Sequence, residues 1–293
     1  MTLRDFALLV AICLIWGLSN VLSKIALGGW AVPPPYFAAI RSAVVLAVTL
    51  PWLRPVPRPL WRILVLGLLM GAGNFALLFI GLQTASPSSV AVVVQAGVPI
   101  TTLLSIVMLG ERIHWRRALG IALTLVGVLI VVWKPGFELS TGLIFVLGAA
   151  FSGSLGAVMM KQMDEIAPLR FQAWVALTAF VPLSIATLLV EQGQWQTSLA
   201  AGWPFVAAVL FSALVVSVFA HTAYYGLIKR YEANLLAPLT LITPMSTIAF
   251  GIAFTGDHLD QRLIIGSALA LLGVLIVAVR KTGAPIAESQ EHS

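Results

Sequence analysis

Long apolar stretches separated by short polar breaks run through the whole chain. Ten of them approach or exceed the roughly 20 residues that an α-helix needs to cross the hydrocarbon core of a bilayer. Runs such as 119–132 lack the alternation of apolar and polar positions that marks a membrane-spanning β-strand. The pattern therefore predicts an all-α integral membrane protein with ten transmembrane helices, at 6–27, 36–53, 60–83, 88–109, 115–133, 141–160, 169–190, 203–228, 233–255 and 262–279.

Composition supports a membrane protein and argues against a soluble one. Of the 293 residues, 60% are hydrophobic and 10% are charged, whereas about 25% are charged in an ordinary soluble domain. Too few polar side chains are present to cover the surface of a soluble protein of this size. The surface must face an apolar phase, so the lipid bilayer is the first predicted partner.

The basic residues are distributed unevenly between the loops. With the N-terminus placed in the cytoplasm, 13 of the 17 Lys and Arg residues fall on the cytoplasmic side, and only Lys134 and Arg262 fall on the other. This bias predicts a multi-pass protein of the cell inner membrane with both termini in the cytoplasm. The net charge of +6 is thus a signal of topology, and no nucleic-acid partner is expected.

The two halves of the chain resemble each other at an offset of 146 residues. The turn that begins at Gly110 matches the one at Gly256, and the run Val-Leu-Ile-Val occurs at both 128–131 and 274–277. At the same offset Gly120 corresponds to Gly266, and Gly127 corresponds to Gly273. Glycines and a polar loop in register are stronger indications of a repeat than matching Leu or Val residues are.

Five spans per repeat is an odd number, so the second repeat must start on the opposite side of the membrane and run inverted. Inverted repeats are typical of transporters, whose substrate sites lie near the midplane between the repeats. The predicted architecture is two inverted five-helix repeats around a central cavity. The expected divisions are 1–137, 138–280 and a disordered cytoplasmic tail at 281–293.

Several short motifs, in order along the chain, resemble the drug/metabolite transporter superfamily, ten-helix EamA type. They are Trp16-Gly17 followed by Lys24, the aromatic-Gly-Leu ends of the third and eighth spans (79–82 and 224–227), the prolines Pro99 and Pro244, and Gly-Glu-Arg at 110–112 followed by Gly120 and Gly127. The resemblance implies a carrier that works by alternating access between its two repeats. Within the superfamily the chain is similar to bacterial amino-acid exporters of the YddG kind, which favour aromatic amino acids.

The function expected from this resemblance is export of small metabolites, with amino acids, including aromatic ones, as the substrates. Export of drugs or other metabolites is the alternative within the family. A channel or an intramembrane enzyme is the alternative outside it. No phosphate-binding loop, nucleophile elbow or metal-ligand spacing occurs, so we expect no catalytic residue, metal or cofactor. The sequence leaves a monomer and a homodimer equally open.

Polar and aromatic residues near the middle of the spans are the candidates for substrate contact. Asn and Gln side chains are costly in hydrocarbon and should point inward, although such residues also serve as hydrogen-bonding links between helices. Aromatic rings could stack on a flat substrate or simply pack against the core. The candidate substrate-binding residues are Trp16, Asn20, Lys24, Arg41, Asn74, Phe79, Gln95, His221 and Tyr224.

Lys24 and Arg41 are the two cations expected inside spans, and His221 is the embedded group that titrates nearest neutral pH. Either cation could attract the carboxylate of a substrate, or its side chain could extend to the lipid headgroups. His221 could take part in transport or only hydrogen-bond a neighbouring helix. No Asp or Glu falls inside a span, so we expect transport without a buried carboxylate as proton relay. Pro99 and Pro244 are candidate hinges, with static curvature of the helices as the alternative.

Overall fold

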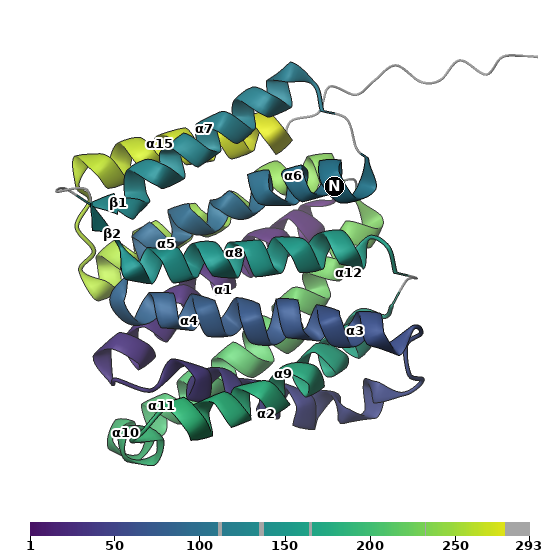
Figure 1. The fold of residues 1–293 in the computed structure, drawn as a ribbon, viewed down its shortest axis with the longest axis vertical. Helices are drawn as coiled ribbons and strands as arrows, with labels where there is room; N and C mark the ends of the chain where they lie inside the picture. The colour runs from purple at the N-terminus through teal and green to yellow at the C-terminus, as the bar shows by residue number, and fades with distance from the viewer. Residues whose placement is uncertain (111–112, 135–137, 164–165, 232, 279–293) are drawn as a thin grey trace, which may run out of the picture.

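The protein is described here from a computed structural model, which covers all residues except 111–112, 135–137, 164–165, 232 and 279–293. The predicted tail at 281–293 lies outside the described residues. Nearly all of the described chain is helical, and the helices lie side by side in one bundle (Figure 1).

The first half of the chain forms five spans. Short π-helical or 3₁₀-helical segments extend or join its helices at Ile25–Gly29, Leu50–Leu53, Gly67–Gly73 and Val94–Ala96, so that α3 with α4, and α5 with α6, each make one span. The helices are α1 (Leu3–Lys24), α2 (Pro34–Thr49), α3 (Leu60–Leu66), α4 (Asn74–Thr84), α5 (Pro87–Val93), α6 (Gly97–Leu109) and α7 (Trp115–Val132).

The second half repeats this arrangement after a two-residue antiparallel pairing of β1 (Trp133–Lys134) with β2 (Glu138–Leu139). A π-helical segment, Phe211–His221, joins α11 to α12, and a second one, Gly251–Thr255, extends α14. The helices are α8 (Thr141–Met160), α9 (Pro168–Val190), α10 (Gln194–Ala201), α11 (Trp203–Leu210), α12 (Thr222–Arg230), α13 (Ala233–Leu239), α14 (Ile242–Phe250) and α15 (Gln261–Ala278).

Within the described residues, nine helical stretches are long and apolar enough to cross a membrane, and a tenth, Ile242–Thr255, is shorter. The predicted ten-span architecture is therefore confirmed, but the ninth span is not the continuous helix expected over 233–255. It is interrupted at Thr240 and Leu241, four and three residues before Pro244. A proline removes a backbone donor and collides with the preceding turn, and here the Thr243 amide donates to the Thr240 carbonyl in a turn (2.9 Å).

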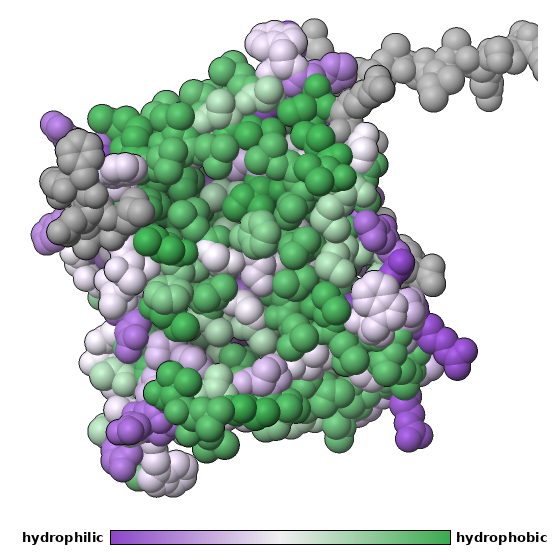
Figure 2. Space-filling model, viewed as in Figure 1, coloured by the Kyte–Doolittle hydropathy of each residue, from purple (hydrophilic) through white to green (hydrophobic). Residues whose placement is uncertain are grey.

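The outer surface has the character that a bilayer requires. Apolar side chains cover the middle of the face shown in Figure 2, whereas hydrophilic ones gather at the two edges where the helices of Figure 1 end. Large apolar residues such as Val107, Leu188 and Leu189 are about 80% exposed in the isolated chain, at 82%, 79% and 79%. In a bilayer these side chains contact lipid.

The closest approach between the two halves is that of α7 and α15, which run side by side (Figure 1). A methyl group added at Gly120 would come within 2.7 Å of the Gly273 carbonyl oxygen, and one added at Gly266 would come within 2.7 Å of the Gly127 oxygen. These two contacts map onto each other under the 146-residue offset of the repeat. Thr124, whose hydroxyl lies 3.5 Å from the carbonyl oxygen of its own counterpart Ala270, is placed at the pseudo-two-fold axis. The repeats are inverted, as predicted.

Hydrogen bonds between helix ends show which ends share a side of the bundle. At the end where the chain begins, the Tyr231 hydroxyl donates to Asp5 (2.7 Å) and the Arg62 guanidinium donates to the Gln162 carbonyl (2.6 Å). At the opposite end, the Glu191 carboxylate accepts from the Tyr36 amide (2.9 Å), and burial raises the pKa of this carboxyl. We call these the termini side and the far side. That the termini side is cytoplasmic remains a prediction from the charge distribution.

We predict that Gly127→Ala will destabilise the protein because its methyl group would lie 2.5 Å from both the Ala270 amide nitrogen and the Gly266 carbonyl oxygen. Overpacking of this kind typically costs about 1–3 kcal/mol. Thermal unfolding of purified protein in detergent should show a lower midpoint. Gly226→Ala is the matched control, because a methyl group there meets nothing within 4 Å. Equal midpoints for the two variants would contradict the packing described here.

Candidate functional site

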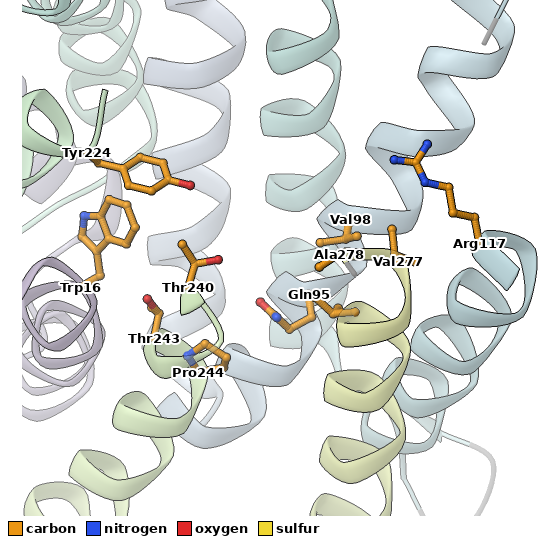
Figure 3. Close-up of a pocket in the computed structure, with 11 residues that line it drawn as sticks. Trp16, Gln95, Val98, Arg117, Tyr224, Thr240, Thr243, Pro244, Val277 and Ala278 are labelled. Carbon is orange, nitrogen blue, oxygen red and sulfur yellow. The ribbon is translucent and has the colours of Figure 1, made fainter. Parts of the chain in front are cut away.

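A cavity of about 380 Å³, which we call the larger cavity, opens between the repeats. Figure 3 shows Trp16, Tyr224 and Thr240 on one wall and Gln95, Val98 and Arg117 on the other. Because Arg117 is near the start of α7 and Ala278 ends α15, the cavity lies toward the termini side. Its described lining consists of Trp16, Gln95, Val98, Arg117, Tyr224, Thr240, Thr243, Pro244, Val274, Val277 and Ala278.

The break in the ninth span forms part of this cavity. Thr240 lies in the interruption between α13 and α14, and Thr243 and Pro244 follow it in the first turn of α14. Non-helical backbone is tolerated at membrane depth only where protein or a water-filled cavity satisfies its polar groups. Discontinuous helices of this kind are also a recurring element of transporter substrate sites. The interruption therefore marks a position suited to a ligand.

A second cavity of about 230 Å³ lies among the second, third, sixth, seventh and eighth spans. It combines one cation, two amides, one imidazole and several aromatic rings, and its described lining contains no carboxylate. The lining residues are Arg41, Met70, Asn74, Phe75, Gly153, Phe171, Gln172, Val175, His221 and Tyr225.

Arg41 is the buried charge of the second cavity, with only 5% of its surface exposed. Its Nη2 donates to the Ser217 hydroxyl (2.5 Å), its Nε donates to the Ser212 carbonyl (3.4 Å), and its guanidinium carbon lies 3.7 Å from the centre of the Phe75 ring. Within the described part of the chain no carboxylate pairs with it. The side chain thus points into the bundle, and extension to the headgroups, the alternative raised by the sequence, does not apply to Arg41.

The π-helical segment Phe211–His221 supplies the partners of Arg41. Its wider turn aligns side chains with carbonyls five residues earlier, and the Ser217 hydroxyl donates to the Ser212 carbonyl (2.8 Å) while His221 Nδ1 lies 2.8 Å from the Val216 carbonyl. A carbonyl can only accept, so Nδ1 carries the proton and, in the neutral ring, Nε2 is an acceptor. Such π-helical insertions are frequent at functional sites.

Aromatic side chains separate the two cavities. The Trp16 ring lies 5.4 Å from the His221 ring and 5.0 Å from the Tyr224 ring, measured between centroids. Trp16 and Tyr224 line the larger cavity, whereas His221 and Tyr225 line the smaller one. The consecutive tyrosines of α12 therefore face different cavities, and the Trp16–His221 contact forms part of the wall between them.

The predicted substrate-binding residues divide into three groups. Trp16, Gln95 and Tyr224 line the larger cavity, together with the candidate hinge Pro244. Arg41, Asn74 and His221 line the smaller one. The others line neither: Asn20 donates to Thr247 (3.4 Å), Lys24 donates to the Gln83 carbonyl (3.1 Å), Phe79 packs in the core against Phe37 (5.2 Å), and Pro99 is buried in α6.

Gln172 and Arg117 are among the polar cavity residues that were not predicted. Gln172 is 8% exposed and lines the smaller cavity, near the start of an apolar run. An amide inside a span was the signal that could have found it. Arg117 was counted with the loop cations that set the topology, and no feature of the sequence distinguishes it from its neighbour Arg116.

On the far side, Asp257 joins the two repeats. Its carboxylate accepts from the backbone amide of Ser88 (2.8 Å), from the Ser88 hydroxyl (2.5 Å) and from the Thr255 hydroxyl (2.9 Å). The first two bonds connect the end of the ninth span with the start of the fourth. The bundle is thus held together on the far side, opposite the opening of the larger cavity.

Ten spans in two inverted repeats, with cavities among them and a broken helix at one wall, define a membrane transporter. The chain belongs to the EamA-like transporter family, whose model matches residues 5–133 and again residues 140–279. The double match agrees with the repeats seen in the packing of α7 against α15.

Named relatives and a solved structure cover almost the whole chain. A probable amino-acid metabolite efflux pump of Salmonella typhimurium is 27% identical over 286 residues, covering 94% of this chain and 95% of that protein. The uncharacterized inner membrane transporter YedA of Escherichia coli is also 27% identical, and the match covers 94% of this chain and 91% of YedA. One crystal structure superposes with a TM-score of 0.65 at 19% identity over 94% of this chain and 96% of the other, which supports the fold alone.

We predict that Asp257→Ala will loosen the far side, because the Ser88 amide and hydroxyl lose their acceptor. Hydrogen–deuterium exchange measured by mass spectrometry should rise in peptides covering 87–93. Asp260→Ala is the control, because it removes the same charge from the same loop. Among the described residues, the Asp260 side chain accepts only from the Leu263 amide (2.7 Å), within its own repeat. Exchange at 87–93 that is unchanged, or that rises equally in both variants, would contradict the connection described here.

Proposed function

We propose that this transporter exports amino acids, aromatic ones among them, and that Arg41 binds the substrate carboxylate in the smaller cavity. The observation that carries the proposal is the buried guanidinium of Arg41, which has no carboxylate partner among the described residues. An isolated buried charge is costly unless it is paired. A substrate carboxylate would supply the missing partner.

The donors of Arg41 suit this role. A guanidinium has five N–H groups, and the hydrogen bonds to Ser217 and Ser212 use two of them, which leaves three. Arginine binds carboxylates in a planar, two-bonded geometry that lysine cannot reproduce. The Phe75 ring packs against the guanidinium of Arg41 and fixes the orientation of that group.

Acceptors for the substrate ammonium lie in the same cavity. The Asn74 amide nitrogen donates to the Ala149 carbonyl (2.7 Å), which leaves the amide oxygen as an acceptor. His221 Nε2 is a second acceptor in the neutral ring, since Nδ1 is used by Val216. A zwitterion, with one negative and one positive end, fits this set better than a cationic drug does, because Arg41 would repel a cation.

The remaining lining favours an apolar or aromatic side chain on the substrate. Phe75, Phe171 and Tyr225 surround the cavity, and Phe171 and Tyr225 pack edge to face at 6.0 Å. The relative in Salmonella typhimurium named as a probable amino-acid metabolite efflux pump supports the same substrate class. Export from the cytoplasm across the inner membrane follows if the termini side is cytoplasmic, as the positive charges predict.

The described residues that line the two cavities favour a carrier over an enzyme. They also include no buried carboxylate that could relay protons. Neither described lining contains an Asp or a Glu, so no buried carboxylate is placed to shuttle protons. We therefore propose facilitated transport or coupling to a solute other than the proton. An enzyme would need a nucleophile, or a second acid or base, beside His221. Our proposal assigns no residue a catalytic role.

The test is counterflow of radiolabelled phenylalanine in proteoliposomes containing the purified full chain, with competitors that differ in one group. In the wild type, phenylalanine should compete about 10- to 100-fold better than phenethylamine, which lacks the carboxylate. In Arg41→Gln this preference should fall about tenfold or more, because the guanidinium that distinguishes the two compounds in the smaller cavity is gone. Size-exclusion elution of each variant checks that it is folded.

Lys24→Gln is the matched control, since Lys24 is an embedded cation that lines neither cavity. This variant should keep the preference for phenylalanine. Loss of the preference in Lys24→Gln but not in Arg41→Gln would move the carboxylate site to the far end of α1. A wild type that exchanges no amino acid in a broad panel would overturn the proposed function itself.

A further inference from the structure

We infer that the larger cavity is a second substrate-binding site, in which Arg117, Gln95 and Tyr224 bind the carboxylate end of the same substrate before it reaches Arg41. This inference rests on the proposed function. It goes beyond that function by assigning a separate site on the termini side of the Trp16–His221 wall, with Arg117 as its charged residue. Two sites in series would let the transporter select its substrate twice.

The polar side chains of the larger cavity lack partners within the protein. The Arg117 guanidinium, the Gln95 amide and the Tyr224 hydroxyl form no hydrogen bond or ion pair with any part of the chain that the structure describes. Figure 3 shows Tyr224 and Gln95 directed at the space between the walls from opposite sides, and Arg117 beyond Val98 and Ala278 on the Gln95 side. Polar groups that line a cavity without a protein partner are satisfied by a ligand or by water.

The charge of the cavity selects for an anionic group. Arg117 is its one cation, and the described lining includes no carboxylate that could neutralise it. Tyr224 on the opposite wall and Gln95 on the same wall add neutral donors. Three donors around a space with one positive charge are the chemistry that binds a carboxylate, which is also the group that Arg41 is proposed to hold.

The wall of the larger cavity that contains Trp16 and Tyr224 suits the side chain of an aromatic amino acid. Trp16 and Tyr224 meet edge to face at 5.0 Å, and the Trp16 ring is turned toward the cavity in Figure 3. A ring bound there would lie against the Trp16–His221 contact, which separates it from the smaller cavity. Passage to Arg41 would then require movement of this wall.

Arg116 provides an internal comparison for Arg117. The two residues are adjacent at the start of α7 and carry the same charge. Arg116 is exposed and does not line the larger cavity, and its guanidinium carbon lies 5.5 Å from the centre of the Trp115 ring. This is the position of a residue that contacts lipid headgroups. If Arg117 binds substrate, its substitution must therefore change transport in a way that the same substitution of Arg116 does not.

The experiment compares Arg117→Gln with Arg116→Gln in the full chain. In proteoliposomes, Arg117→Gln should raise the KM for phenylalanine counterflow about tenfold with little change in the maximal rate, because a charged hydrogen bond is lost but the Arg41 site remains. Equilibrium binding of labelled phenylalanine to protein in lipid nanodiscs should give two molecules per wild-type chain and one per Arg117→Gln chain. Arg116→Gln should match the wild type in both measurements.

Tyr224→Phe is the second variant, for use if Arg117→Gln does not fold. It removes only the hydroxyl and should raise the KM in the same direction by a smaller factor. Equal effects of Arg117→Gln and Arg116→Gln would assign both residues to headgroup contact and overturn the inference. A wild type that exchanges phenylalanine but binds one molecule per chain would also overturn it, and the proposed function would stand. A wild type that exchanges no amino acid would overturn both.

Discussion

The contact of α7 with α15 is the constraint on which the rest of the architecture depends. Glycines at four positions allow the two backbones to approach until carbonyls and α-carbons are in van der Waals contact. In a bilayer, helices gain little from hiding apolar surface from lipid, so close packing of small residues supplies much of the association. This contact joins the last span of each repeat, and both cavities are enclosed by spans that the joined repeats hold in place.

A buried charge can persist in such a bundle only where the helices satisfy it. Arg41 is held by a π-helical segment whose turn presents a hydroxyl and a carbonyl together, and by the face of an aromatic ring. These contacts offset part of the cost of removing a guanidinium from water. They leave the charge without a carboxylate partner among the described residues, which is why we propose that the smaller cavity binds an anionic group. Arg117 in the larger cavity differs, because it is only partly buried and has no such partners among the described residues.

The sequence predicted the general architecture because the signals for it are summed over many residues. Ten apolar runs, the bias of the basic residues and the register of the glycines each depend on the whole chain, and single exceptions do not disturb them. The break at Thr240 and Leu241 was not predicted, because one proline in an apolar run is compatible with either a kink or an interruption. Likewise, a position along a span does not say whether Lys24 or Arg41 faces lipid, cavity or another helix. That depends on rotation about the helix axis, which the packing decides.

The reciprocal glycine contacts of α7 and α15 have a consequence for the energetics of the transport cycle. An interface that maps onto itself when the two repeats exchange roles has the same free energy whether the protein is open to one side of the membrane or to the other. It therefore contributes nothing to the balance between the two states. The equilibrium between the two states is therefore set by contacts that have no counterpart in the other repeat. Small changes in a few polar groups at the helix ends would be enough to change which side the empty transporter faces.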